Sequence, residues 1–200
     1  MRDVRDVRYV RVWRFEAPQL CISSGPVGGG IGLRSWIINA QVPIDYARTD
    51  LEAHVRELAI VHGCEGTGVG MLTAADVRDA SIAEEDAIEV CATVGVTLPT
   101  WAAADDGEVR PWRPGTINVV AHVPVRLSDA ALVNAVMTMT EAKAQALFEA
   151  GVPGTGTASD ALCVACNPDG ALEAFAGPRS RVGAPLARAV HAAVGRGVRR

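Results

Sequence analysis

Residues 128–166 read SDAALVNAVMTMTEAKAQALFEAGVPGTGTASDALCVAC, and this stretch decides the fold because a long helix is followed closely by a strand. Ser128 is a favoured N-cap residue, and Gly151 is typical of a helix C-terminus. One side of the predicted helix carries a stripe of long side chains: Leu132, Val136, Met139, Lys143 and Leu147. A glycine turn over 154–157 then leads into a predicted strand over 160–166.

Strands and helices continue on both sides of this stretch. The arginine-rich opening over 2–14 favours a strand, with its arginines on the solvent side and at the edges, because it also contains Val, Tyr, Trp and Phe. Two capping boxes, Thr49 with Glu52 and Thr73 with Asp76, predict two helix starts. The other predicted elements are strands over 20–24, 35–42, 88–94 and 116–123, a helix over 49–62, a short helix from 73, a long loop over 99–114 and a last helix from Pro185 to 194.

This order of elements predicts an α+β fold. Hairpin-like strand pairs are followed by helices, no linker separates them, and no internal repeat has a clear period. We expect a single domain over 1–200 in which helices pack on a mainly antiparallel sheet. A four-layer αββα sandwich is one form that such a domain can take.

Composition narrows the function classes. Hydrophobic residues make up 49% of the 200 residues and charged residues 21%, which excludes a disordered chain. The formal net charge of −4 argues against a nucleic-acid partner and favours a small molecule. No apolar run resembles a signal peptide or a membrane span, so we expect no membrane partner and a cytoplasmic location. The odd number of scattered cysteines, five, predicts reduced thiols.

Several familiar sites are excluded by spacing. The glycine cluster at 28–32 is followed by a strand pattern, so no helix N-terminus is present to hold a dinucleotide phosphate. It is either a hairpin turn or a backbone surface that a bulky ligand can approach closely. Cys163 and Cys166 would lie on opposite faces of a strand, and His54 and His62 are two helical turns apart, too far to share a metal.

Polar residues embedded in turns of small residues remain as candidates. Thr138, Glu141 and Gln145 share one face of the long helix. If that face is buried, Glu141 can act as an acid or base; if it is exposed, Glu141 is an ordinary surface residue. The turn at 154–157 can present N–H groups and hydroxyls to an oxyanion, or it can be a plain β-turn.

Taken in order, these segments resemble one family, the adenosylcobinamide amidohydrolases or CbiZ family. The resemblance spans 25–194 and differs mildly from the family pattern at Leu72, where a second methionine is usual, and at Ser159, where a threonine is usual. The matching segments are Gly28, Gly29 and Gly30, Asn39, VGMLTAA at 69–75, ATVG at 92–95, GTIN at 115–118, TEAK at 140–143, GTGTASD at 154–160, and FAGP at 175–178 with VG at 182–183.

The resemblance implies hydrolysis of the amide that joins the corrin propionyl side chain to aminopropanol in adenosylcobinamide, giving adenosylcobyric acid in cobinamide salvage or cobamide remodelling. It implies a corrinoid substrate and no metal or nucleotide cofactor; a homo-oligomer is left open. The aromatic loop with Trp101 and Trp112 could cover an apolar corrin face. The substrate-binding residues that we expect are Gly28, Gly29, Gly30, Asn39, Thr73, Thr116 and Lys143.

Amide hydrolysis also needs a nucleophile, a proton shuttle and oxyanion donors, and the chain has no histidine or cysteine motif that supplies the first two. Thr157 is therefore the preferred nucleophile or water-positioning group, with Thr155 as its competitor. Asp160 or Glu141 is the expected base, and Asn118 with turn N–H groups the expected oxyanion donors. Two alternatives stay open: a corrinoid-binding protein without catalysis, and a β-aminopeptidase-like amide hydrolase of another substrate.

Overall fold

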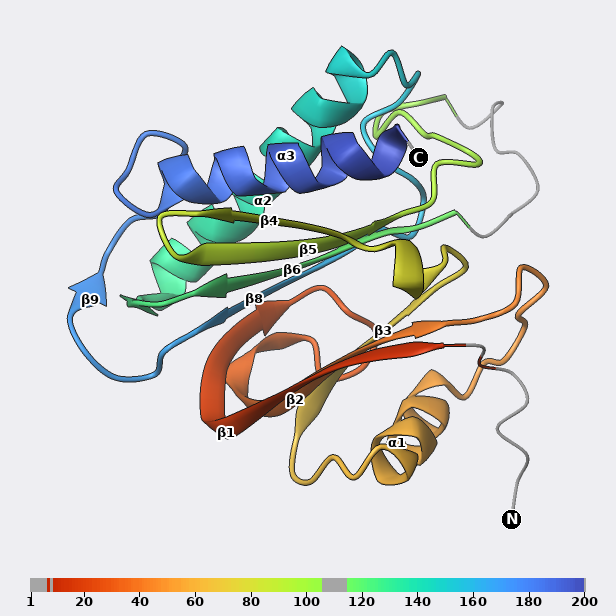
Figure 1. Cartoon of the computed structure of the whole chain (residues 1–200), viewed down its shortest axis with the longest axis horizontal. Coiled ribbons are helices and arrows are strands. Elements are labelled where there is room, and N and C mark those ends of the chain that lie inside the picture. The colour runs from red at the N-terminus through yellow and green to blue at the C-terminus, as the bar shows by residue number, and fades with distance from the viewer. Residues whose placement is uncertain (1–6, 8, 106–114, 200) are drawn as a thin grey trace.

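The computed structural model describes residues 7, 9–105 and 115–199. Within them the chain forms a large mixed sheet, a small two-stranded sheet and helices at both ends of the large sheet (Figure 1). The elements are β1 (Val10–Ser23), β2 (Gly30–Gln41), α1 (Leu51–Val61), β3 (Gly68–Thr73), the 3₁₀-helix η1 (Val77–Asp79), β4 (Ser81–Glu85), β5 (Ile88–Val94), β6 (Ile117–Val123), β7 (Arg126–Leu127), α2 (Asp129–Glu149), β8 (Ala161–Cys166), β9 (Leu172–Glu173) and α3 (Gly183–Val198).

The seven strands of the large sheet have the order β3-β2-β1-β8-β6-β5-β4. The pairs β1–β2, β1–β8, β4–β5 and β5–β6 are antiparallel, whereas β2–β3 and β6–β8 are parallel. Helix α2 lies in the connection between the parallel neighbours β6 and β8, as such a crossover requires. The α+β class with a mainly antiparallel sheet is therefore confirmed.

The helices cover the two ends of the sheet separately. Helices α2 and α3 pack on β4, β5, β6 and β8 through a large apolar cluster that includes Leu132, Val164 and Val190. Helix α1 packs on β2, where Leu58 meets Ile38 and its neighbours. In Figure 1 the two groups of helices accordingly lie above and below the strands.

The sheet is so strongly coiled that the part with β2 and β3 faces the part with β6 and β8. A third cluster joins Ile37 and Met71 from β2 and β3 to Val120 and Cys163 from β6 and β8. We call the side of the sheet that carries this cluster the inner face. The four-layer sandwich is not confirmed, because the seven strands are hydrogen-bonded into one sheet instead of two stacked ones.

The predicted long helix is confirmed in detail. Ser128 caps α2 by accepting a hydrogen bond from the Ala131 N–H at 3.1 Å. Gly151, one residue beyond the C-cap, has φ +74°, a conformation that glycine adopts without strain. Of the predicted stripe, Leu132, Met139, Lys143 and Leu147 are buried and Val136 is half-buried.

The two predicted capping boxes are wrong. Helix α1 begins only after Asp50, whose carboxylate binds the Arg48 guanidinium at 2.8 Å. Thr73 still belongs to β3, and the short helix starts after Asp76, whose carboxylate accepts from the Arg78 N–H. In each case the acidic residue directly before the helix binds a nearby arginine, and the helix begins after that residue.

Other boundaries were missed or shifted. Strands β3, β4, β7 and β9 were not predicted, and α3 begins two residues before Pro185 and continues through Gly195. Arg11 also departs from the predicted solvent side: it is half-buried and donates to the Val77 carbonyl at 3.3 Å. No helix in the described part of the chain combines the length and apolarity needed to cross a membrane.

Candidate active site

The turn before β8 is tied to α2 by an ion pair. Lys143 Nζ binds Asp160 Oδ2, and the two side chains are only 7% and 11% exposed. Thr157 donates from its hydroxyl to Asp160 Oδ1 at 2.5 Å and from its backbone N–H to Oδ2 at 3.1 Å. The Ile117 N–H also donates to Oδ1, at 2.9 Å. We call Lys143, Thr157, Asp160 and the Ile117 N–H the Asp160 cluster; it joins α2, the turn and the start of β6.

Glycine is required at two places in this turn. A Cβ at Gly156 would collide with Asp160 Oδ2 and Lys143 Nζ, and one at Gly154 would come within 2.7 Å of the Thr100 nitrogen. The segment around Thr100 runs against the turn, with the Thr100 N–H donating to the Gly156 carbonyl at 2.8 Å. The glycines therefore allow a buried ion pair and a neighbouring chain segment to lie directly on the turn backbone.

The two candidate threonines have different surroundings. Thr155 accepts at its hydroxyl from the Ala102 N–H at 3.1 Å, so it fastens the turn to the segment that carries the half-exposed Trp101. Thr157 instead faces Asp160, a potential base that Lys143 orients. A nucleophile, a base and an orienting group in contact are the arrangement that hydroxyl catalysis needs, and it favours Thr157 over Thr155. Trp112 lies outside the described residues.

Two more hydroxyls lie beside the Asp160 cluster. Thr116 Oγ1 and Ser159 Oγ are 2.8 Å apart, and the Ser159 N–H is 3.5 Å from Thr157 Oγ1. Thr116 is buried whereas Ser159 is exposed. Ser159 can therefore offer its hydroxyl to a bound carbonyl while Thr116 holds it in place.

Asn39 and Asn118 meet each other on the inner face. Asn118 Nδ2 donates to Asn39 Oδ1 at 2.8 Å and to the Leu72 carbonyl at 3.1 Å, and Asn39 Nδ2 donates to Thr93 Oγ1 at 3.1 Å. Both amides are almost completely buried. Side chains alternate along a strand, so Asn118 points to the inner face while Asp160 points to α2. The structure does not bring Asn118 to Thr157, and its amide donor is already in use.

The glycine turn at 25–30 closes the β1–β2 hairpin, as one of its two interpretations predicted. Gly28 and Gly30 have φ of +65° and +80°. The carbonyls of Gly28 and Gly29 accept from the Arg34 guanidinium at 3.0 and 3.3 Å. Ser24, just before the turn, exchanges hydrogen bonds of 3.0 Å with Leu162, which places the start of the turn beside the beginning of β8.

Thr73, an expected binding residue, and Glu141, an expected base, do not contact the Asp160 cluster. Thr73 is 1% exposed and accepts at its hydroxyl from the Ala75 N–H at 3.1 Å, a local turn contact. Glu141 is exposed and lines a groove between α2 and α3 together with Gln145 and His191. Because Glu141 is two residues from Lys143 on a helix, its side chain leaves α2 on another side. Of the two expected bases, only Asp160 contacts Thr157.

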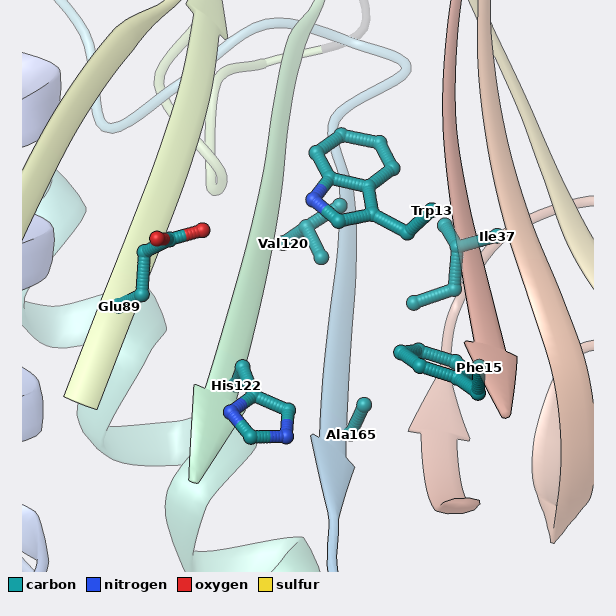
Figure 2. A pocket seen from close by; sticks show the side chains of 7 residues that line it. All are labelled: Trp13, Phe15, Ile37, Glu89, Val120, His122 and Ala165. Atoms are coloured by element: carbon teal, nitrogen blue, oxygen red, sulfur yellow. The ribbon is translucent and has the colours of Figure 1, made fainter. Parts of the chain in front are cut away.

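A cleft on the inner face was missed by sequence reasoning. It has a volume of about 140 Å³, with Trp13 and Phe15 on one wall and Glu89 and His122 on the other (Figure 2). Ile37, Val120 and Ala165 complete its lining. Glu89 and His122 are direct partners in the β5–β6 register, and this pairing has no signal in the sequence because the strands are separated by the long loop.

The five cysteines are free thiols. Cys163 packs in the inner-face cluster and Cys166 in the cluster under α2 and α3, which confirms that they lie on opposite faces of β8. A hydrogen bond with Cys21 and burial both raise the pKa of the Cys163 thiol, and burial raises the pKa of Cys91 and Cys166. No group of three His, Cys, Asp or Glu side chains among the described residues could hold a metal ion.

Comparisons with known proteins identify the family that this chain is similar to. The sequence model of a family described as "Adenosylcobinamide amidohydrolase", CbiZ, matches residues 2–200. An adenosylcobinamide amidohydrolase of Methanosarcina mazei is 34% identical over 162 residues, which cover 81% of this chain and 74% of that protein. One of Halobacterium salinarum is 40% identical over 130 residues, which cover 62% of this chain and 55% of that protein.

The PH0078 protein from Pyrococcus horikoshii OT3 is similar in structure, with a TM-score of 0.48 and 12% identity over 92% of this chain and 72% of that one. The family match rests on the sequence, which it covers almost from end to end. The chain belongs to the CbiZ family, the adenosylcobinamide amidohydrolases.

Proposed function

We propose that this chain hydrolyses adenosylcobinamide at the amide between the corrin propionyl side chain and aminopropanol, and that it releases adenosylcobyric acid. The observation that carries the proposal is the Asp160 cluster, because it unites three of the segments on which the family resemblance rests. Lys143 comes from TEAK at 140–143, Thr157 and Asp160 from GTGTASD at 154–160, and Ile117 from GTIN at 115–118.

In the proposed reaction Thr157 Oγ1 adds to the amide carbonyl carbon, or holds the water that does so, and the proton released moves to Asp160 Oδ1. The hydroxyl of Ser159 and N–H groups of the turn donate to the oxyanion that forms. The oxyanion collapses, the C–N bond breaks, and the aminopropanol nitrogen takes the proton. If Thr157 adds directly, water then cleaves the ester and restores the hydroxyl, so that overall one amide and one water give an acid and an amine.

Lys143 holds the base in this scheme. Its ammonium occupies Asp160 Oδ2, so that Oδ1 faces the Thr157 hydroxyl. We further propose that the reaction takes place in the cytoplasm, where five free thiols stay reduced.

The test is turnover of adenosylcobinamide by the purified protein without added metal, with adenosylcobyric acid and aminopropanol measured by mass spectrometry. Thr157→Ala should lower kcat about 10²- to 10³-fold or more, because it removes a group at the reacting bond. Thr155→Ala is the matched control, and its kcat should stay within a few-fold of the parent protein. Binding of the corrinoid without any turnover would favour the binding protein, and equal losses in the two variants would contradict the role of Thr157.

A further inference from the structure

The cleft between Trp13 and His122 combines ring faces with polar groups that have no hydrogen-bond partner among the described residues. Trp13 and Phe15 are half-buried on β1, and Glu89 and His122 are exposed on β5 and β6 (Figure 2). Within the described residues, the Glu89 carboxylate, the His122 ring and the Trp13 N–H make no hydrogen bond or ion pair. The cleft therefore offers a ligand one hydrogen-bond acceptor, the Glu89 carboxylate, and one donor, the Trp13 N–H. The His122 imidazole can donate or accept.

The size and chemistry of the cleft select the ligand. Its volume of about 140 Å³ is well below the ~300–1,000 Å³ of sites for whole drug-sized ligands, so a corrin ring does not fit. Three ring systems around a small space favour a flat ligand that stacks. A small ammonium ion would need only one ring and the carboxylate, and it would leave the second aromatic ring and the imidazole unused.

We propose that this cleft binds a planar heteroaromatic base that carries an N–H donor, of the adenine type. The base stacks on Trp13 or Phe15 and donates to the Glu89 carboxylate. Two sources share this chemistry: the adenosyl group of the corrinoid substrate and a free nucleoside. The first source rests on the proposed function, whereas the second does not.

The cleft is separate from the Asp160 cluster. Thr116, beside that cluster and directly before β6, and His122, in the cleft, are six residues apart, which is about 20 Å along an extended chain. The buried Asn39–Asn118 pair lies between them. A base in the cleft cannot touch the reacting bond, so it contributes to substrate affinity instead of to the chemical step.

The direct test is calorimetric titration of the full chain with 5′-deoxyadenosine, which needs no turnover. Trp13→Ala should weaken binding about 5- to 150-fold, the range found for single base-stacking side chains. Glu89→Gln should weaken it about fivefold, because it replaces a charged acceptor by a neutral one. Phe148→Ala is the matched control, since Phe148 is 75% exposed at the end of α2, away from the cleft residues. This variant should bind 5′-deoxyadenosine with the affinity of the parent protein.

A second measurement identifies the source of the base. If the source is the adenosyl group, 5′-deoxyadenosine competes with adenosylcobinamide. Trp13→Ala then raises the KM for adenosylcobinamide more than the KM for cobinamide without the adenosyl group. If 5′-deoxyadenosine binds in the cleft but does not compete, the source is a free nucleoside. Glu89→Gln, an exposed and isosteric change, keeps the test valid if Trp13→Ala does not fold.

The proposal is overturned if 5′-deoxyadenosine does not bind, if 1-aminopropan-2-ol binds in its place, or if Trp13→Ala, Glu89→Gln and Phe148→Ala all bind it like the parent protein. A protein that binds 5′-deoxyadenosine in the cleft but hydrolyses no corrinoid refutes the proposed function and leaves the cleft assignment standing.

Discussion

Replacing Lys143 with Met should destabilise the protein far more than an ordinary surface substitution. Lys143 and Asp160 are 7% and 11% exposed, so the variant leaves the Asp160 carboxylate nearly buried without its cation. Removal of one partner of a buried ion pair costs about 3–5 kcal/mol. Three hydrogen bonds from Thr157 and Ile117 still reach Asp160, and they place the expected loss at the lower end, about 3 kcal/mol.

The assay is urea unfolding followed by circular dichroism, with the free energy of unfolding taken from each transition. A loss of ~3 kcal/mol corresponds to a fall in Tm of about 6–12 °C for a chain of this size. The double variant Lys143→Met/Asp160→Asn should be more stable than the sum of the two single losses predicts, by about 0.5–3 kcal/mol, because it removes both charges.

The matched control is Arg56→Met. Arg56 and Glu52 form an ion pair of the same charge types, but their side chains are 70% and 73% exposed. Exposed pairs contribute about 0–1 kcal/mol, so this variant should unfold almost like the parent protein. If Lys143→Met costs no more than Arg56→Met, or if the double variant shows no coupling, the reasoning that places a buried ion pair at the centre of the site is refuted.

Four further predictions concern the turn, the thiols and the helix cap. Gly156→Ala should cost about 1–3 kcal/mol in urea unfolding because its Cβ overlaps the Asp160–Lys143 pair, and an unchanged midpoint would contradict this packing. A thiol reagent should label half-buried Cys64 first and buried Cys163 only on unfolding. Because the folded state raises the pKa of Cys163, it binds more protons than the unfolded state at alkaline pH, so stability should be lost as pH rises above the ordinary thiol value of 9.0; a rise in stability there would disprove the assignment. Ser128→Ala should lower the free energy of unfolding by ~1 kcal/mol, and Ser128→Asp, which can still cap α2, should restore most of it.

The candidate site was predictable in part. The motif order drew attention to Lys143, Thr157 and Asp160, and these three side chains are in contact. Glu141, predicted in the same motif as Lys143, is exposed in another groove because two neighbouring positions on a helix point in different directions. The Glu89–His122 pair could not be found, since only the β5–β6 register sets it.

Local sequence by itself determined the elements whose interactions close within a few residues. Helix α2 between the Ser128 cap and Gly151 is such an element, because its hydrogen bonds close within the helix. The pattern at 88–94 and the glycines at 28–30 predicted a strand and a hairpin turn, although β5 takes its hydrogen-bond partners from β4 and β6. The tertiary structure alone decided what meets across the chain: Asp160 with Lys143, 17 residues away, and with Ile117, 43 residues away. Strand order, register and coiling of the sheet depend on apolar burial summed over all seven strands, so no short stretch of sequence encodes them.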